Sequence, residues 1–363
     1  MKKLQHFLLP FLVIFLSCDP LVTEFGDIED AIMYEAKTIV DTPAKDTIDV
    51  MTWNIRFGAA RMPWFGDACG DRVILSDDEV LTNLENIANY LTETDPDIVF
   101  LQEVDRESKR TAYRDEAQWL LDHTPFNYAA YASIWQSQFI PSDGLGRMDL
   151  GNVILSKWPI KDAIRHPLPL RGDQDALVQL FYLRRNILEA KIEMGATTFY
   201  AVNIHATAFA TDDTKQKHIR QYKELLDRID AEGAAFISGG DLNSLPTTAV
   251  KTDYCLEDMC AGESFHQPGD DPEHKEGSLF SGQDLSPLYD SDYEPAVPLA
   301  DYTADEAAYF THTPDYDNPD GFDRKLDYLW TNRHWVPGSD RTHRAAKSYS
   351  DHLPVTARWE VGQ

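Results

Sequence analysis

Residues 98–103 read IVFLQE, and the fold class can be inferred outward from this stretch. Four consecutive apolar residues are typical of a strand buried on both faces, which here delivers Glu103 to its carboxyl end. A helix precedes it, because Ser76 and Glu79 form a capping box and apolar residues then recur at helical spacing. Before that helix, IDVMTWNIRF at 48–57 predicts another strand. The region therefore begins with strand, helix, strand.

The alternation of strands and helices returns further along the chain. Apolar runs predict strands at residues 152–155, 186–192, 198–204, 234–237, 326–331 and 353–359. Asp212 opens a helix that ends at Gly233. This mixture indicates an α/β fold with two sheets rather than one parallel sheet. Residues 251–322 are rich in Pro, Gly and Asp with little periodicity, so a loop-rich insertion is expected within a domain spanning 47–363.

The charge balance is strongly acidic. The 363 residues contain 33 Lys plus Arg against 61 Asp plus Glu, a formal charge of −28. Such a chain does not hold nucleic acid on a broad basic face. A nuclease remains possible, since a local cleft and bound cations are enough to dock a polyanion that must later be released. Nucleic acid is thus expected only as a substrate.

The N-terminus has the layout of a secretory signal. MKKLQHFLLPFLVIFLSC places two lysines before an apolar run that is too short to span a bilayer comfortably. Cys18 after a small residue resembles a bacterial lipoprotein cleavage site, although ordinary signal cleavage is the alternative. We therefore expect a signal peptide at 1–17, a lipidated Cys18 that binds the membrane, and a tether at 18–46. The protein would lie in the cell envelope, periplasmic or on the cell surface.

Export also bears on the other cysteines. An oxidising compartment favours a local disulfide between Cys255 and Cys260, which leaves Cys69 unpaired. A zinc site with His266 and His274 does not fit the spacing of common zinc loops.

Polar residues suited to phosphoester hydrolysis stand at the ends of the predicted strands. That reaction requires charge neutralisation on anionic oxygens and an activated water, for which carboxylates, amides and histidines are suited. The candidates are Asn54, Glu103, His205, Asp241, Asn243, Asp327, Asp351 and His352. Each alone has a simpler explanation as a turn or strand-end residue. Together they predict side chains that converge at one rim of the fold.

The sequences and order of these stretches resemble the motifs of the endonuclease/exonuclease/phosphatase family, whose fold is shared with deoxyribonuclease I. The likeness covers about residues 47–361 and includes GNVILSKWPI, GGDLN and SDHLPV. It implies a four-layered αββα sandwich, in which two mixed sheets pack face to face with helices outside.

The resemblance also implies roles in metal binding and proton transfer for five of the candidates. Glu103 corresponds to the principal metal carboxylate, with Asn54 and Asp351 completing or orienting the metal shell. Oxygen ligands suit Mg²⁺, with Mn²⁺ as an alternative. His352 corresponds to the catalytic histidine and Asp327 to the carboxylate that fixes its tautomer.

Further roles concern water and phosphate. Asp241 would orient the attacking water, Asn243 would donate to a phosphoryl oxygen, and His205 would contact the phosphate or assist departure. Arg185 matches a phosphate-contacting arginine, with Arg184 as its rival. The carboxylate that supports the second histidine in some members is not evident, and Asp149 is only a guess.

The sequence thus predicts a Mg²⁺-dependent phosphoester hydrolase acting outside the cytoplasm. The alternative is a binding protein that kept the fold and lost turnover. Nuclease and lipid or small-molecule phosphoesterase stay open, as does the oligomeric state. Trp64 and Phe65 either line the mouth of the cleft or simply pack their loop onto the body.

Overall fold

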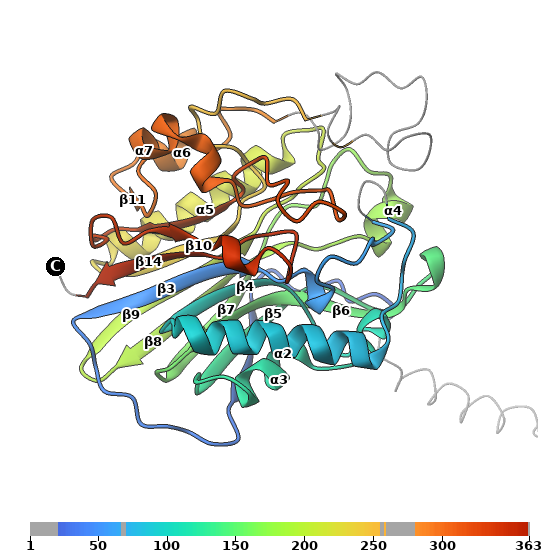
Figure 1. Cartoon of the computed structure of the whole chain (residues 1–363), viewed down its shortest axis with the longest axis horizontal. Helices are drawn as coiled ribbons and strands as arrows, with labels where there is room; N and C mark the ends of the chain where they lie inside the picture. Colours follow the sequence, from blue (N-terminus) through green and yellow to red (C-terminus); the bar gives the residue numbers. More distant parts are fainter. Residues whose placement is uncertain (1–20, 67–69, 255–257, 259–279, 362–363) are drawn as a thin grey trace, which may run out of the picture.

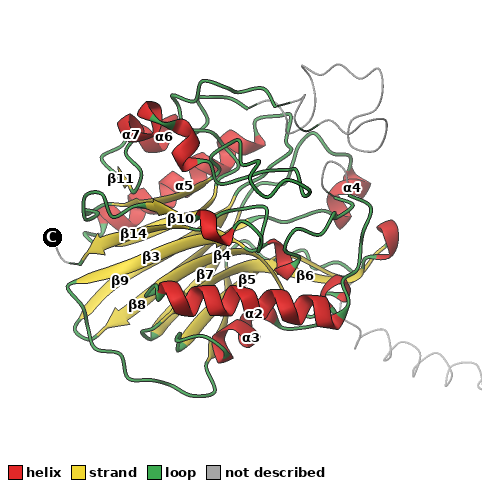
Figure 2. Ribbon diagram, viewed as in Figure 1, coloured by secondary structure: helices red, strands yellow, loops and turns green. Residues whose placement is uncertain are grey.

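The computed structural model describes residues 21–66, 70–254, 258 and 280–361. Within them, two seven-stranded mixed sheets pack face to face and helices cover their outer sides, which confirms the expected four-layered sandwich (Figure 1 and Figure 2). The signal peptide, Cys18, Cys69 and the Cys255–Cys260 pair lie outside the described residues. Among the described helices, none is long and apolar enough to cross a membrane.

The first sheet contains, in order, β13 (Arg341–Thr342), β14 (Val355–Glu360), β3 (Thr47–Asn54), β4 (Ile98–Asp105), β6 (Gly146–Ser156), β5 (Tyr128–Ile140) and β2 (Ile32–Glu35). The second contains β1 (Glu29–Asp30), β7 (Ile160–Pro167), β8 (Asn186–Met194), β9 (Thr197–His205), β10 (Phe236–Asp241), β12 (Asp327–Thr331) and β11 (Glu294–Pro295). Each sheet has one parallel pair, β3 with β4 and β9 with β10. These two parallel pairs carry four of the eight candidate residues, namely Asn54, Glu103, His205 and Asp241.

The main helices have apolar faces that are buried against the sheets. The α-helices are α2 (Asp77–Thr94), α3 (Glu116–Asp122), α4 (Ala176–Phe181), α5 (Thr214–Ala231), α6 (Ser286–Tyr289) and α7 (Leu299–Ala304). Short 3₁₀ turns are η1 (Arg56–Gly58), η2 (Lys109–Thr111), η3 (Ser142–Gly144), η5 (Glu306–Tyr309) and η6 (Arg344–Ala346). The predicted capping box of α2 is present, with Ser76 and Glu79 each accepting from the other's backbone.

Three apolar layers hold the sandwich together. One lies between the sheets and joins Phe100 and Ile154 to Ile192 and Ile237. A second packs α2 and α3 onto the first sheet, and a third packs α5 onto the second. Burial in these layers is the dominant favourable contribution to folding.

A buried amide pair also joins the two sheets. Gln102 of β4 donates to Asn203 Oδ1 of β9 at 2.8 Å, and Asn203 donates in turn to the carbonyls of Leu101 and Val153 at 2.8 Å each. These directional bonds lie one residue before Glu103 and two before His205. They fix the relative position of the two strand ends on which the site is built.

The folded body begins earlier than the sequence indicated. The start expected near residue 47 is wrong, because β1 pairs with β7 and β2 pairs with β5 as edge strands. Strands of two and four residues carry too little alternation to be recognised in a sequence. Most of the expected tether therefore lies on the body, and the expected loop-rich insertion also contains α6, β11, α7 and η5.

Candidate active site

Three of the expected site residues stand side by side on the second sheet. Asp241 ends β10, where it pairs with His205 of parallel β9 and with Asp327 of antiparallel β12. Strand register alone therefore brings together two carboxylates and an imidazole that are far apart in the sequence. All three side chains are at least 97% buried.

The two glycines before Asp241 allow this close approach. A Cβ on Gly239 would lie 2.3 Å from the carbonyl oxygen of Tyr328, and one on Gly240 would lie 1.9 Å from that of Ile204. Gly240 also has φ of 142°, a backbone conformation that L side chains rarely adopt. The GGD sequence is thus what lets β10 fit between β9 and β12.

The first sheet contributes its residues through a distortion of β4. The register between β4 and β6 shifts between Leu101 and Val104, and Glu103 has φ of 56°. Such a bulge re-aims a side chain and is common beside active sites. It turns Glu103 out of the sheet and leaves its side chain 25% exposed beside the second sheet.

Asn54 links the two sheets at the site. Its Nδ2 lies 3.1 Å from both Glu103 Oε1 and Asp241 Oδ2, while its Oδ1 accepts from the backbone of Arg56 at 3.0 Å. The amide therefore donates to both carboxylates in this arrangement and fixes their separation.

His352 is held by Asp327 in the arrangement that the sequence suggested. Nδ1 lies 2.8 Å from Asp327 Oδ2, and Nε2 lies 3.7 Å from Asp241 Oδ2. The indole of Trp53 donates to the carbonyl of His352 at 3.0 Å and anchors its backbone. Burial alone would lower the pKa of His352, but Asp327 and Asp241 outweigh it and raise the pKa to about 10.

Asp241 and His205 are perturbed in the direction of their neutral forms. Burial raises the pKa of Asp241 to about 7 against the opposing charge of His352. Burial also lowers the pKa of His205 well below its usual value, and Arg185 and His352 add to this shift. His205 Nε2 lies 3.4 Å from Asp241 Oδ2 and 3.9 Å from Glu103 Oε1. The imidazole is therefore neutral and faces both carboxylates.

The suggested support of His205 by Asp149 is wrong. Asp149 accepts from Tyr131 Oη at 2.7 Å and from Gln136 at 3.0 Å. His205 Nδ1 is buried and has no hydrogen-bond partner among the described residues. Position in the sequence does not show which way the Asp149 side chain points from β6, and in the structure its carboxylate faces Tyr131 and Gln136 instead of His205.

Asp351 forms an ion pair that no local sequence pattern indicates. Its Oδ2 lies 3.1 Å from Arg56 Nε, and its Oδ1 accepts from Ser350 Oγ at 3.1 Å. Arg56 has φ of 49° in the turn after Asn54. Arg56 is part of the TWNIR stretch, but only the conformation of the turn shows that its side chain points back to the site.

Arg185, rather than its rival Arg184, lines the site. Its side chain is buried, its Nη1 has no hydrogen-bond partner in the described part of the chain, and burial lowers the pKa of Arg185. Asn243 has φ of 46°; its backbone N–H donates to Asp241 Oδ1 at 3.0 Å and its side chain to the carbonyl of Ala206 at 3.1 Å. The unsatisfied Nη1 of this buried guanidinium is available to bind an anion.

A cleft of about 130 Å³ joins these groups. Its lining includes Arg56, Glu103, Arg185, His205, Asp241, Asn243, His312 and Asp351, and on its apolar side Trp64, Trp135, Leu150, Leu183 and Phe209. Trp64 lines the cleft and also packs edge-on against Phe57 with ring centroids 5.2 Å apart. Phe65 instead packs on the cluster around Ile140. The first interpretation therefore applies to Trp64, which lines the cleft, and the second to Phe65, which packs the loop onto the body.

His312 is a further residue of the cleft, and no sequence pattern points to it. Its ring meets that of His352 edge-on at 4.6 Å between centroids, and it lines the same cleft. Burial lowers the pKa of His312 well below its usual value. The residue lies in the irregular segment before β12, where no periodic pattern marks it.

The described residues contain one cluster of His and acidic side chains compact enough for a metal ion. Its members are Asp241, Asp327 and His352, with ligand atoms within 4.8 Å of one another. The 2.8 Å bond between Asp327 and His352 Nδ1 already occupies two of these groups. Glu103 and Asp351 add carboxylate oxygens in the cleft beside Asp241, so the donor set is rich in the oxygens that hard cations bind.

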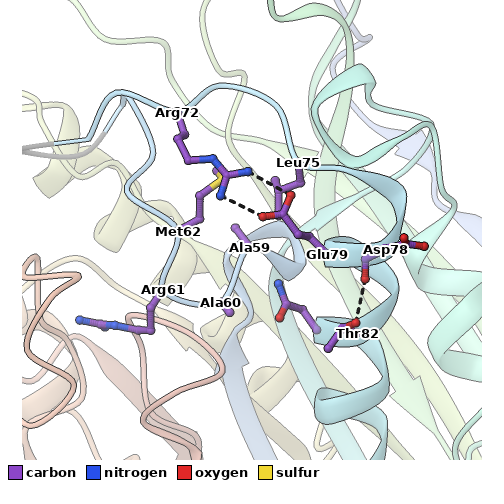
Figure 3. A pocket seen from close by; sticks show the side chains of 10 residues that line it. Ala59, Ala60, Arg61, Met62, Arg72, Leu75, Asp78, Glu79 and Thr82 are labelled. Atoms are coloured by element: carbon purple, nitrogen blue, oxygen red, sulfur yellow. Dashed lines mark hydrogen bonds and ion pairs between the residues drawn. The ribbon is translucent and has the colours of Figure 1, made fainter.

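A second hollow, of about 360 Å³, lies between the segment after η1 and the start of α2 (Figure 3). There Arg72 forms two bonds to Glu79, at 2.9 and 3.0 Å, and Thr82 donates to the carbonyl of Asp78. The lining of this hollow contains no histidine, and its Glu79 is already bonded to Arg72, so it lacks the cluster of histidines and carboxylates that lines the first cleft.

Comparison with known proteins agrees with this geometry. A family profile described as the Endonuclease/Exonuclease/phosphatase family matches residues 51–352. The chain belongs to the endonuclease/exonuclease/phosphatase family. Members of this family are in general phosphoesterases or nucleases, and its fold is consistent with metal-dependent phosphoester hydrolysis. No curated protein matches the chain.

Solved structures of the endonuclease/exonuclease/phosphatase family share the fold. One from Beutenbergia cavernae has a TM-score of 0.58 and 19% identity, covering 88% of this chain and 72% of its own. A Bacteroides vulgatus structure has a TM-score of 0.50 and 13% identity, covering 86% of this chain and 98% of its own. One from Leptotrichia buccalis has a TM-score of 0.50 and 14% identity, covering 85% and 98%.

Proposed function

We propose that this protein hydrolyses phosphoesters with the help of a divalent cation, outside the cytoplasm. The observation that carries the proposal is the His352–Asp327 pair facing Asp241, in one cleft with Glu103 and Arg185. A proton donor, a water-orienting carboxylate, a metal carboxylate and an anion site then lie within the reach of one phosphate group. The envelope location rests on the signal and Cys18 read in the sequence.

The residues present fit Mg²⁺, with Mn²⁺ as an alternative. Glu103 would hold the ion with a partly exposed carboxylate, and Asp351 would complete the set of ligands. Asn54 would orient Glu103, because its amide donates to that carboxylate. When bound, the cation would neutralise phosphoryl oxygens and favour the ionised form of nearby carboxylates.

Proton transfer falls to Asp241 and His352. A carboxylate with a pKa near 7 is suited to accept a proton from an attacking water at neutral pH. His352 retains its proton near neutrality and can donate to, or stabilise, a developing negative oxygen. Asp327 fixes its orientation and compensates its charge.

The remaining groups hold the substrate. Arg185 supplies a buried cation for a phosphate oxygen, and neutral His205 can donate to another oxygen or to the departing group. Asn243 stands beside Asp241 and is placed to contact the phosphoryl group. These contacts would position the ester for in-line attack.

The test uses the full-length chain and bis(p-nitrophenyl) phosphate. We expect p-nitrophenol release that requires Mg²⁺ and stops with EDTA, with His352→Ala and Glu103→Ala each lowering kcat at least about 100-fold. His123→Ala is the matched control, because His123 is exposed and stacks on Trp119 at 4.0 Å. Equal release by His352→Ala would support the binding-protein alternative instead.

A substrate panel decides between polynucleotides and smaller phosphoesters. The small cleft and the charge of −28 favour a lipid head group or another small organic phosphate over a long polyanion. Plasmid DNA, RNA, sphingomyelin, inositol phosphates and sugar phosphates, each with an EDTA control, would be compared. Faster hydrolysis of DNA or RNA than of every small substrate would contradict this preference.

A further inference from the structure

Helix α4 exposes apolar side chains that a soluble surface would normally bury. Leu177 is 68% exposed, Val178 45% and Leu180 37%, and no residue of the helix is fully buried. Single exposed apolar residues are ordinary, but three in one six-residue helix are a concentrated group. Figure 1 shows α4 at the periphery of the molecule.

The helix is held firmly in this exposed position. Asp175 Oδ1 accepts from the backbone of Leu177 at 2.9 Å and of Val178 at 3.0 Å, a strong N-cap. At the other end, Trp135 donates to the carbonyl of Phe181 at 2.8 Å. The apolar side chains are therefore presented by an ordered element.

This apolar helix adjoins the mouth of the catalytic cleft. Trp135, which bonds to the end of α4, lines the cleft, and so does Leu183, two residues after the helix. Arg185 follows two residues later. Whatever α4 contacts is consequently brought to the entrance of the active site.

The N-terminal end of the described chain lies at the same end of the first sheet. Gln138 of β5 donates to the carbonyl of Leu21, and Phe139 beside it is 55% exposed. Phe181 of α4 packs on the cluster that contains Ile140. Leu21 is itself 52% exposed, so apolar side chains from three segments gather at this end.

Chain length then limits how far this end can lie from a membrane. Cys18 is three residues before Leu21, and an extended chain covers at most about 10 Å over that distance. With a lipid on Cys18, the end of the molecule carrying Leu21 must stay at the bilayer surface. No long tether separates the body from the membrane, because Val22 and Thr23 already pair with β5.

We propose that one end of the molecule carries a bilayer-docking surface, formed by Leu177, Val178 and Leu180 together with Phe139 and Leu21. Docking through this surface orients the catalytic cleft toward the lipid head groups. Apolar side chains of an interfacial helix enter the boundary between head groups and acyl chains by about 5–10 Å. The strongly acidic chain gains nothing from anionic lipid, so apolar insertion drives this docking. This inference depends on the lipid anchor and not on turnover.

The experiment is site-specific photocrosslinking in the full-length chain. The protein is purified from membranes, reconstituted into phosphatidylcholine vesicles, and carries p-benzoylphenylalanine in place of Val178 or, as a matched control, Val40. Val40 is also exposed, at 60%, but bonds to Asn127 at the opposite end of β5. The 13 residues of β5 separate the two ends by roughly 40 Å.

Docking predicts lipid adducts from position 178 at least tenfold more abundant than from position 40. Adding Leu177→Asp and Leu180→Asp to the 178 probe should lower its lipid adducts at least tenfold. Hydrolysis of bis(p-nitrophenyl) phosphate should stay unchanged in that variant, since neither residue lines the cleft.

Three results would overturn the docking surface. Equal lipid adducts at both positions, or adducts unaffected by the two aspartates, would show passive tethering. Protein adducts in place of lipid adducts at position 178 would show that another part of this chain, or a second copy, covers α4. None of these depends on metal-dependent hydrolysis, so a failure of the catalytic proposal is seen separately.

Discussion

At the scale of single residues, the dyad of His352 and Asp327 makes the most direct prediction. Asp327→Asn removes the carboxylate that most strongly raises the pKa of His352 and that fixes its tautomer. We expect kcat on bis(p-nitrophenyl) phosphate to fall at least about 100-fold at saturating Mg²⁺. Asp97→Asn is the control, since Asp97 is equally buried and ion-paired with Lys157 but lies at the far end of β4. Comparable losses of kcat in both variants would point to unfolding instead.

Arg185 should lower the free energy of unfolding while strengthening the binding of substrate. Arg185 Nη1 is buried and has no hydrogen-bond partner among the described residues, which costs free energy in the folded protein, so Arg185→Met should raise the free energy of unfolding by about 1–3 kcal/mol. Loss of a charge-assisted bond to phosphate should lower kcat/KM roughly 10–100-fold. Urea unfolding and steady-state kinetics measure the two effects.

Arg165 provides the contrast for that substitution. It is also buried and its Nη1 likewise has no partner among the described residues, but its Nε donates to the carbonyl of Ser133 at 3.0 Å and its Nη2 to that of Arg184 at 2.9 Å. Arg165→Met leaves those carbonyls without their partner and should lower the free energy of unfolding. If Arg185→Met were as destabilising as Arg165→Met, Arg185 would have a structural role that its contacts do not reveal.

Lys215 gives a pH dependence of stability. Burial lowers its pKa from 10.5 to about 8, against the raising effect of Asp284. Between about pH 8 and 10.5 the unfolded chain keeps the proton on Lys215 while the folded chain releases it, so the free energy of unfolding rises with pH in that window. Below about pH 8 both states are protonated, and the full cost of burying the charged lysine is present. Lys215→Met should therefore stabilise more at pH 7.5 than at pH 9.5, by about 1–2 kcal/mol. Urea unfolding at both values tests this, and an equal gain at both would contradict it.

At the scale of elements, β10 depends on its glycines. In Gly240→Ala, the new Cβ would meet the carbonyl oxygen of Ile204 at 1.9 Å, and φ of 142° would be strained as well. We expect a loss of about 3 kcal/mol or more in the free energy of unfolding. Gly233→Ala is the control, because φ is 75° there and nothing lies within 4 Å. It should cost only about 1 kcal/mol.

The elements also show why part of the site could be predicted from the sequence. A continuous apolar run marks a buried strand, and a polar residue at its end is therefore a candidate, as with Glu103, His205, Asp241 and Asp327. Strand register then brings the side chains together, because the pairing of β9, β10 and β12 makes His205, Asp241 and Asp327 neighbours. Local patterns suffice where neighbouring strands alone determine the geometry.

The residues that were missed depend on contacts between distant segments. Arg56 reaches Asp351 through a turn with φ of 49°, and His312 reaches His352 from an irregular segment. Neither position has a periodic pattern. The amide pair of Gln102 and Asn203 likewise exists only once two sheets are packed. Such features follow from tertiary structure and leave no local signal in the sequence.

At the scale of the whole molecule, the net charge of −28 should oppose folding by self-repulsion. Raising ionic strength from 0.01 to 0.15 M shortens the Debye length from about 30 to about 8 Å and screens that repulsion. The free energy of unfolding should then rise on the order of 1 kcal/mol at pH 8. Near the isoelectric point of about 4.6 the net charge is small, so the same salt step at pH 5 should have little effect. Tetramethylammonium chloride should act like NaCl, because screening needs no bound cation. A larger effect of salt at pH 5 than at pH 8 would show that local ion pairs, not net charge, govern the response.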